Sequence, residues 1–234
     1  MSDADWTNFQ PYISQLEQEG KVTRTFRRLD PDRQEAVFNA ILEEAAEKGP
    51  ASLNVKEIAR RAGVSVGSLY QYFPNRDGLL DFAVELCTSS TIAIFQEYKP
   101  IMAAMPLKEA MSAYLLGGLE WGQMAMGLVR FFGRAAYQGD PDLAERLVRP
   151  IATVMRETMQ EILIQAQKRG EIRRDLDIDA VARVINALII VFGDSQMLPY
   201  LNTYFQISDG TVSSEQVSEA LLEFIQHGIA VEEK

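Results

Sequence analysis

The side chains best suited to chemistry form a short polar set near residue 70, and that chemistry is recognition by hydrogen bonding. Gln71 can offer a paired donor and acceptor to the edge of an adenine. Tyr70 and Tyr72 can donate hydroxyls to phosphate, and the small Gly67 and Ser68 would let the backbone approach a duplex. The set therefore predicts contact with double-stranded DNA. The alternative is two packed short helices that bind nothing.

The elements that would position these side chains are two short helices joined by a tight turn. Apolar residues recur at helical spacing between residues 55 and 62. Gly63 can end this first helix, because glycine adopts the left-handed conformation easily, and Ser65 can cap the second. Leu69 and Phe73 lie four residues apart and face inward, which leaves residues 66–68 and 70–72 largely outside. This is the plan of a helix-turn-helix, whose second helix enters the major groove.

The same stretch resembles a known family. The run I-A-R-R-A-G-V-S-V-G-S-L-Y-Q-Y-F at residues 58–73, followed by N-R-D-G-L-L at 75–80, is similar to the TetR family of bacterial transcription regulators. The resemblance covers about residues 31–80, and the remainder matches only in helix order and length. Two departures stand out: Val66, where many relatives carry a polar or basic residue or proline, would remove one DNA contact, and Arg76 replaces the more usual lysine.

The resemblance implies an all-α protein with three parts. We expect an N-terminal extension and basic arm at residues 1–29, a helix-turn-helix head at 30–74, and a ligand-binding and dimerisation domain at 75–234. Asp30 followed by Pro31 should start the first helix of the head. A long helix should run from about Asn75 to Tyr98, with a break marked by the prolines that follow it.

The N-terminal residues leave alternatives open. Residues 1–20 have apolar residues at helical spacing and could form a short docked helix, but disorder fits equally well. The following basic run contains Arg24, Arg27 and Arg28 without an acid among them. In the resembled family such arms reach DNA, often through the minor groove; a solvated tail is the alternative. The full set predicted to bind DNA is Arg24, Arg27, Arg28, Asn54, Ser65, Val66, Gly67, Ser68, Tyr70, Gln71, Tyr72 and Arg76.

The charge distribution agrees with a DNA-binding head despite a net charge of −10. Residues 21–77 carry ten Lys and Arg against eight Asp and Glu, whereas residues 1–20 carry four acids and no base. The remaining negative charge lies after residue 77. A DNA-binding module needs to be basic only on the face that meets phosphate.

Composition disfavours several other classes of protein. A single cysteine, Cys87, and a single histidine, His227, cannot build a disulfide framework, a zinc cluster or more than one catalytic triad. We therefore expect no enzyme, no metal and no cofactor. No signal peptide is visible, and the most apolar run, residues 184–192, is too short to span a bilayer. A cytoplasmic protein without a membrane partner is predicted.

A second candidate site lies in the C-terminal part. Aromatic and methionine side chains between residues 114 and 137 alternate with glycines, as in the wall of an apolar pocket. Ordinary helical core is the alternative, and the expectation of a small, mostly apolar effector comes from the family resemblance. The predicted ligand-binding residues are Tyr114, Gly118, Trp121, Met124, Phe131, Phe132, Arg134 and Asn186.

The last two predicted helices suggest the assembly. The helix around residues 181–192 is apolar almost all round, and Ser213 with Gln216 can form a capping box for the final helix. In the resembled family these two helices of each subunit build a four-helix bundle, which implies a homodimer on a palindromic operator. Closing the core of a monomer is the alternative. The function implied is a ligand-responsive regulator, most simply a repressor; a helical adaptor that contacts protein is the rival.

Overall fold

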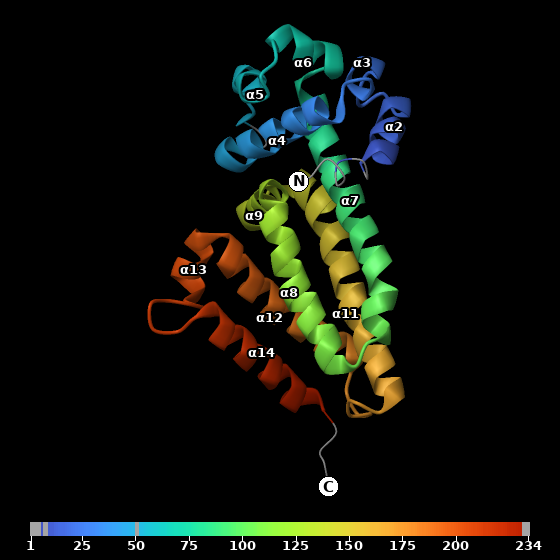
Figure 1. The fold of residues 1–234 in the computed structure, drawn as a ribbon, viewed down its shortest axis with the longest axis vertical. Coiled ribbons are helices and arrows are strands. Elements are labelled where there is room, and N and C mark those ends of the chain that lie inside the picture. The colour runs from blue at the N-terminus through green and yellow to red at the C-terminus, as the bar shows by residue number, and fades with distance from the viewer. Residues whose placement is uncertain (1–5, 7–8, 50–51, 231–234) are drawn as a thin grey trace. The chain divides into compact units, whose positions relative to one another are not determined.

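The protein is all-α, as predicted. A computed structural model describes residues 6, 9–49 and 52–230, and the only β pairing in those ranges is one isolated bridge between Ile172 and Ala230 (Figure 1). The helices, in chain order, are α2 (Gln10–Gln18), α3 (Arg24–Arg27), α4 (Pro31–Lys48), α5 (Val55–Arg61), α6 (Val66–Tyr72), α7 (Arg76–Ala104), α8 (Leu107–Met124), α9 (Met126–Gln138), α10 (Pro141–Leu143), the π-helical turn η2 (Ala144–Val148), α11 (Arg149–Arg169), α12 (Ile178–Met197), α13 (Pro199–Phe205) and α14 (Ser214–Ile229).

Contacts divide the chain into two compact units. The first contains residues 1–92 and 125–150, and the second contains residues 93–124 and 151–234. The first unit therefore joins the head to the beginning of α7 and to α9, α10 and η2. The second unit contains the rest of α7 with α8 and nearly all of the chain from α11 onward.

The core of the first unit is a cluster of aromatic rings. Phe82 of α7 lies with its ring centroid 5.0 Å from Phe26, 5.3 Å from Phe73 and 5.9 Å from Phe38, and all four side chains are fully buried. Burial of each ring stabilises the fold by about 1.5–3 kcal/mol. The head thus completes its core with a side chain from α7, because three short helices alone enclose little apolar surface.

The N-terminal extension is folded onto the same core. Trp6 and Ile13 are completely buried, and the ring of Trp6 lies 5.5 Å from that of Phe38 in α4. Of the two alternatives for this segment, the structure has the docked helix, α2, within its own subunit. Residues 1–5 and 7–8 lie outside the described residues.

The helix starts follow the capping residues expected from the sequence. Asp30, Asn54 and Ser65 each accept hydrogen bonds from the first backbone amides of α4, α5 and α6. Ser213 and Gln216 form the predicted capping box of α14. A side-chain oxygen at this position satisfies an amide that has no partner inside the helix.

One helix end differs from the expectation. The break was predicted at about Tyr98, but α7 continues through Pro100 to Ala104. Proline removes only one hydrogen bond this close to the helix end, and the extra turn buries Met102 and Ala103. α7 is also apolar and long enough to cross a membrane by length and composition alone; its most apolar window has mean hydropathy 1.4 and is 56% buried, as in core helices of soluble proteins.

The second unit has its own apolar core, formed by one face each of α8, α11, α12 and α14. The core includes Met111, Tyr114, Leu115, Met159, Ile162, Leu163, Ile185, Ile189, Phe192, Ile225 and Ile229.

The sequence did not predict α13, which begins at Pro199 and buries Leu201.

Candidate nucleic-acid interface

α5 and α6 form the predicted helix-turn-helix. Gly63 has a φ of +66°, the left-handed conformation that closes α5. The Ser65 hydroxyl accepts from the backbone amide of Ser68 at 2.9 Å and lies 2.8 Å from the Ser68 hydroxyl. Leu69 and Phe73 are buried beneath α6. The turn at Gly63, the Ser65 cap and the buried Leu69 and Phe73 together leave the N-terminal end of α6 at the surface.

The outward face of α6 is polar and uncharged. Tyr70 is 55% exposed, Gln71 and Gly67 are exposed, and Val66 and Ser68 are partly buried. Tyr72 differs from the expectation, since only 7% of its surface is exposed and its ring lies 5.9 Å from that of Phe26. These residues can read bases by hydrogen bonds and apolar contact, but they bring no charge to phosphate.

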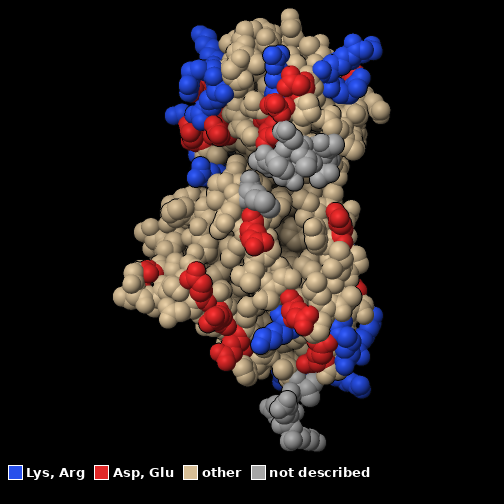
Figure 2. Space-filling view, viewed as in Figure 1, with Lys and Arg blue, Asp and Glu red and all other residues tan. Residues whose placement is uncertain are grey.

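Basic residues instead lie beside α6, on α3 and α5. Arg24 and Arg28 are exposed on α3 and its C-terminal cap, and Lys56 is exposed at the start of α5. Arg27 is partly buried and forms an ion pair with Glu17 of α2. Arg76 is exposed at the start of α7. Figure 2 shows Lys and Arg gathered towards both sides of this end of the first unit, with uncharged surface and a smaller patch of basic and acidic residues between them.

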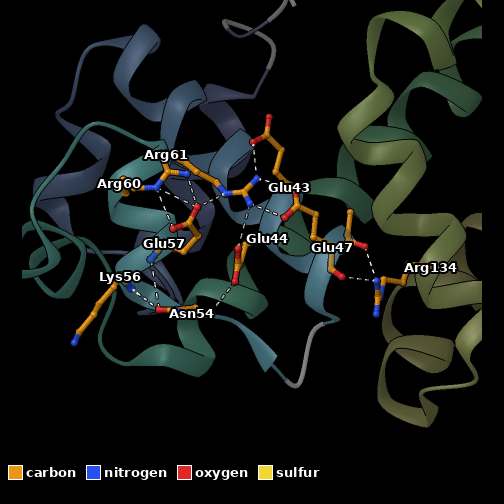
Figure 3. A network of polar contacts seen from close by, with 10 residues as sticks. Glu43, Glu44, Glu47, Asn54, Lys56, Glu57, Arg60, Arg61 and Arg134 are labelled. Carbon is orange, nitrogen blue, oxygen red and sulfur yellow. Dashed lines mark hydrogen bonds and ion pairs between the residues drawn. The ribbon is translucent and has the colours of Figure 1, made fainter.

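A partly exposed ion-pair network, centred on Arg61, holds α5 against α4. Arg61 reaches Glu47 at 2.6 Å, Glu43 at 3.2 Å and Glu44 at 3.6 Å, and hydrogen bonding to Glu47 raises the pKa of the guanidinium (Figure 3). Glu44 is only 1% exposed and also accepts from the backbone amide of Asn54 at 3.3 Å. The network sets the orientation of the helix that precedes the turn.

Asn54 and Arg60 stabilise the two ends of α5 by hydrogen bonding. Asn54 caps α5 by accepting from the amides of Lys56 at 3.1 Å and Glu57 at 3.4 Å, which keeps its own side chain at the surface. Arg60 hydrogen-bonds Glu57 and lowers the pKa of that carboxyl to about 2. Lys56 and Arg60 were not among the residues predicted to bind DNA, although their spacing four apart places them on one side of α5.

The predicted ligand-binding residues fall into both units. In the second unit, the hydroxyl of Tyr114 donates to the side-chain oxygen of Asn186 at 3.1 Å, inside the apolar core. Burial raises the pKa of Tyr114. Gly118 is exposed and Trp121 is partly buried on the same helix; the side chain of Met124 lies outside the described residues.

The other three predicted ligand-binding residues belong to the first unit. Phe131 is completely buried and Phe132 is partly buried on α9. Arg134 donates to the backbone carbonyls of Ala46 at 2.6 Å and Glu47 at 2.9 Å, at the C-terminal end of α4 (Figure 3). Of the predicted ligand-binding set, the structure thus brings Tyr114 and Asn186 into contact, and it engages Arg134 with α4. Among the described residues, no group of three His, Cys, Asp or Glu could hold a metal.

Family models match both the N-terminal and the C-terminal parts of the chain. Residues 37–82 match the family described as "Bacterial regulatory proteins, tetR family", and residues 128–192 match "Tetracyclin repressor-like, C-terminal domain". The nucleoid occlusion factor SlmA of Marinobacter nauticus is 24% identical over 179 residues, which are 75% of this chain and 87% of that protein.

Solved structures share the fold. A TetR family transcriptional regulator from Chloroflexus aurantiacus superposes with a TM-score of 0.62 at 20% identity, covering 90% of this chain and 99% of the other. The regulator FadR from Bacillus subtilis, solved in complex with stearoyl-CoA, gives a TM-score of 0.60 at 21% identity and covers 83% and 98%. Similarity at this level of identity establishes the architecture.

Proposed function

The chain belongs to the TetR family of bacterial regulatory proteins, and we propose that it is a ligand-responsive transcriptional regulator. In this proposal it is a repressor that a small, mostly apolar effector releases from a palindromic operator. The observation that carries the proposal is the geometry of α6, a capped helix that presents small and polar side chains outward from a tightly packed head.

The proposed contacts with DNA divide into two kinds. Gln71 and Ser68 would read base edges in the major groove, with Val66 and Gly67 allowing close approach. The flanking set would bind phosphate and set the register of the protein on the duplex. That phosphate-binding set consists of Arg24, Arg27, Arg28, Asn54, Ser65, Tyr70 and Arg76, with Arg27 restrained by Glu17; Tyr72, only 7% exposed, is left out of it.

The proposed effector site is centred on Tyr114 and Asn186. Their hydrogen-bonded pair is a polar contact surrounded by the apolar side chains of the second unit, so it could orient one polar group of an otherwise apolar molecule. The Bacillus subtilis regulator that shares the fold was solved with stearoyl-CoA, a ligand with a long apolar chain. Because the two folds are similar, we infer that a ligand with a long apolar chain suits the apolar interior of the second unit.

A homodimer would present two recognition helices to the operator. Val184 on α12 is 60% exposed and Phe224 on α14 is 69% exposed, so each of these helices leaves an apolar side chain uncovered in the single chain. Pairing α12 and α14 of two subunits would cover both. Phe224→Glu should yield a monomer by sedimentation, whereas Glu223→Gln, a change at the neighbouring exposed position, should leave the dimer intact. A wild-type protein that sediments as a monomer at micromolar concentration would contradict this arrangement.

Regulation would follow from a population shift. Two recognition helices must meet successive major grooves about 34 Å apart. An effector that prefers a mis-spaced dimer by about 3 kcal/mol would weaken operator binding roughly 100-fold. A molecule that co-purifies with the protein, identified by mass spectrometry, is the natural probe. If it binds tightly but leaves operator affinity unchanged, the regulatory part of the proposal is wrong.

Fluorescence anisotropy against the DNA upstream of the gene tests the central claim. Nanomolar, salt-sensitive binding is expected for the wild-type protein. Gln71→Ala should cost about 1–3 kcal/mol on the operator and leave binding to unrelated DNA unchanged. Gln18→Ala, which alters an exposed glutamine on α2, is the matched control and should bind like wild type. Absence of binding even at low salt would refute DNA recognition and favour a helical adaptor.

A further inference from the structure

Thr23 connects the N-terminal extension directly to the recognition helix. Its hydroxyl donates to the backbone carbonyl of Gln71 at 2.6 Å, and its backbone amide donates to the carbonyl of Tyr72 at 2.9 Å. The same hydroxyl accepts from the amide of Phe26 at 3.4 Å, which caps the start of α3. A single residue therefore begins α3 and closes the last turn of α6.

These contacts satisfy groups that α6 cannot satisfy itself. The last four carbonyls of a helix have no partner within it, and Gln71 and Tyr72 are the final two residues of α6. The ring of Phe26 adds a contact on the inner side, 5.2 Å from the ring of Phe73. α3 and the end of α6 are thus held as one rigid piece.

The opposite end of α3 is held as firmly. Gln34 of α4 is fully buried and donates to the carbonyls of Phe26 and Arg27, both at 3.1 Å. Arg24 and Arg28 project from this fixed segment and are exposed. Neither forms an ion pair with any of the residues that the structure describes.

The exposed charges lie on the helices that flank α6 and not on α6 itself. α3 and α5 pack on α6 from opposite sides (Figure 1). α6 itself carries no charged residue, whereas α3 offers Arg24 and Arg28 and α5 offers Lys56. A groove about 12 Å wide is bordered by one phosphate backbone on each side. A helix lying in the groove would therefore bring its two flanks to different strands.

We propose that α3 is a second phosphate-binding element, registered to the recognition helix by Thr23, which contacts the DNA strand across the groove from the strand met by α5. Thr23 is the positioning residue, and Arg24 and Arg28 are the groups that touch phosphate. This inference rests on the proposed function. It differs from a flexible arm in the minor groove, because hydrogen bonds from Thr23 and Gln34 already fix α3, so only the arginine side chains remain to be ordered on binding.

Phosphate-ethylation interference and salt dependence test the placement. For Arg24→Ala/Arg28→Ala we expect the slope of log K against log salt to fall by about 1.8, since each phosphate contact contributes about 0.9. Interference should disappear at one edge of each half-site, on one strand only. Lys56→Ala is the matched control; its slope should fall by about 0.9, with interference lost at the opposite edge.

Substitutions of Thr23 test the positioning role. Thr23→Val keeps the shape and removes the hydroxyl, so the preference for operator over unrelated DNA should fall about two- to tenfold, the worth of one hydrogen bond. The salt slope should stay unchanged, and Thr23→Ser should restore the preference. If Thr23→Val, folded as judged by its circular dichroism, keeps the wild-type preference for operator over unrelated DNA, the positioning role is overturned.

The failures can be told apart. If the wild-type protein binds no DNA at low salt, the proposed function fails and this inference falls with it. If the wild-type protein binds but Arg24→Ala/Arg28→Ala keeps the wild-type slope, α3 is outside the footprint and only this inference is wrong. If interference is lost instead at the phosphates that border the minor groove, the arginines belong to an arm that reaches the minor groove.

Discussion

Gln34 should be among the most sensitive polar positions in the first unit. It is a fully buried amide with four hydrogen bonds. Its side-chain oxygen accepts from the indole of Trp6 at 3.1 Å and from Gln10 at 2.6 Å, and its nitrogen donates to two carbonyls at the end of α3. Gln34 therefore uses both polar atoms of its amide, and it supplies hydrogen-bond partners to Trp6, to α2 and to the end of α3.

Gln34→Met keeps the length of the side chain and removes all four bonds. The indole N–H of Trp6, which is 0% exposed, and the carbonyl of the partly buried Arg27 would then lack partners, whereas the carbonyl of Phe26 keeps its bond from the amide of Leu29. A buried orphan costs about 1–3 kcal/mol, and the partly buried carbonyl lies at the lower end of that range, so the two together cost about 2–4 kcal/mol. The added apolar surface returns about 1–2 kcal/mol. We expect the free energy of unfolding of this unit to fall by about 2 kcal/mol.

Urea denaturation followed by tryptophan emission measures this loss. The sequence has two tryptophans, Trp6 in the first unit and Trp121 in the second, so a Trp121→Phe background reports on the first unit alone. Gln18→Met in the same background is the control, because Gln18 is exposed on α2 and its change should stay within about 0.5 kcal/mol. If Gln34→Met unfolds at the same urea concentration as this control, the reasoning from orphaned polar groups is refuted.

Three further outcomes are expected. Arg61→Met should lower the stability of the same unit by about 3–5 kcal/mol in that assay, because it leaves the buried carboxyl of Glu44 without a cation; equal midpoints would contradict the network's role. The pKa of Glu57 is lowered from 4.5 to about 2 by the hydrogen bond from Arg60, so its stabilising contribution is complete above about pH 4.5 and is lost as pH falls towards 2. Thermal unfolding of Glu57→Gln should accordingly lose part of the wild-type decline between those pH values, and an unchanged profile would argue against the pair. Tyr114→Phe should destabilise the second unit by about 1–3 kcal/mol, measured by urea denaturation followed by emission of Trp121 in a Trp6→Phe background, since the side-chain oxygen of Asn186 loses its donor.

The parts of the fold that the sequence predicted correctly depend on local chemistry. Asp30, Asn54 and Ser65 mark helix starts because a short polar side chain bonds amides only two or three residues away. Gly63 marks the turn because its conformation is difficult for other residues. Such signals need no knowledge of distant parts of the chain.

The structure differs from the predictions where contacts with residues distant in the sequence determine the burial or the hydrogen bonds of a side chain. Tyr72 follows Leu69 by three residues and lies at the border of the inward face; Phe26, 46 positions earlier in the chain, covers it. Arg134 lies in an aromatic run that suggested a pocket wall, yet its hydrogen-bond partners are carbonyls 87 and 88 positions earlier. Helical spacing alone cannot reveal which side chain will arrive from elsewhere.

Thr23 and Gln34 were missed for a related reason. Thr23 precedes a short basic helix and could have been recognised as its cap. Its second role, closing the end of α6, joins residues 48 apart and has no local signature. Gln34 reads as an ordinary polar position on α4, and only the docking of α2 and α3 makes it a buried centre.

The separation of charge from α6 has a consequence for how DNA recognition can be altered. Affinity for phosphate would come from α3 and α5, whereas base reading would come from the uncharged face of α6. Substitutions on α6 should then change which sequence is bound at a constant salt slope, because α6 has no charged side chain whose contact with phosphate could be lost. Substitutions on α3 or α5 should change the slope for operator and unrelated DNA equally. Thr23 joins the two functions, since its hydrogen bonds to the end of α6 help to fix where the arginines of α3 lie relative to the bases that α6 reads.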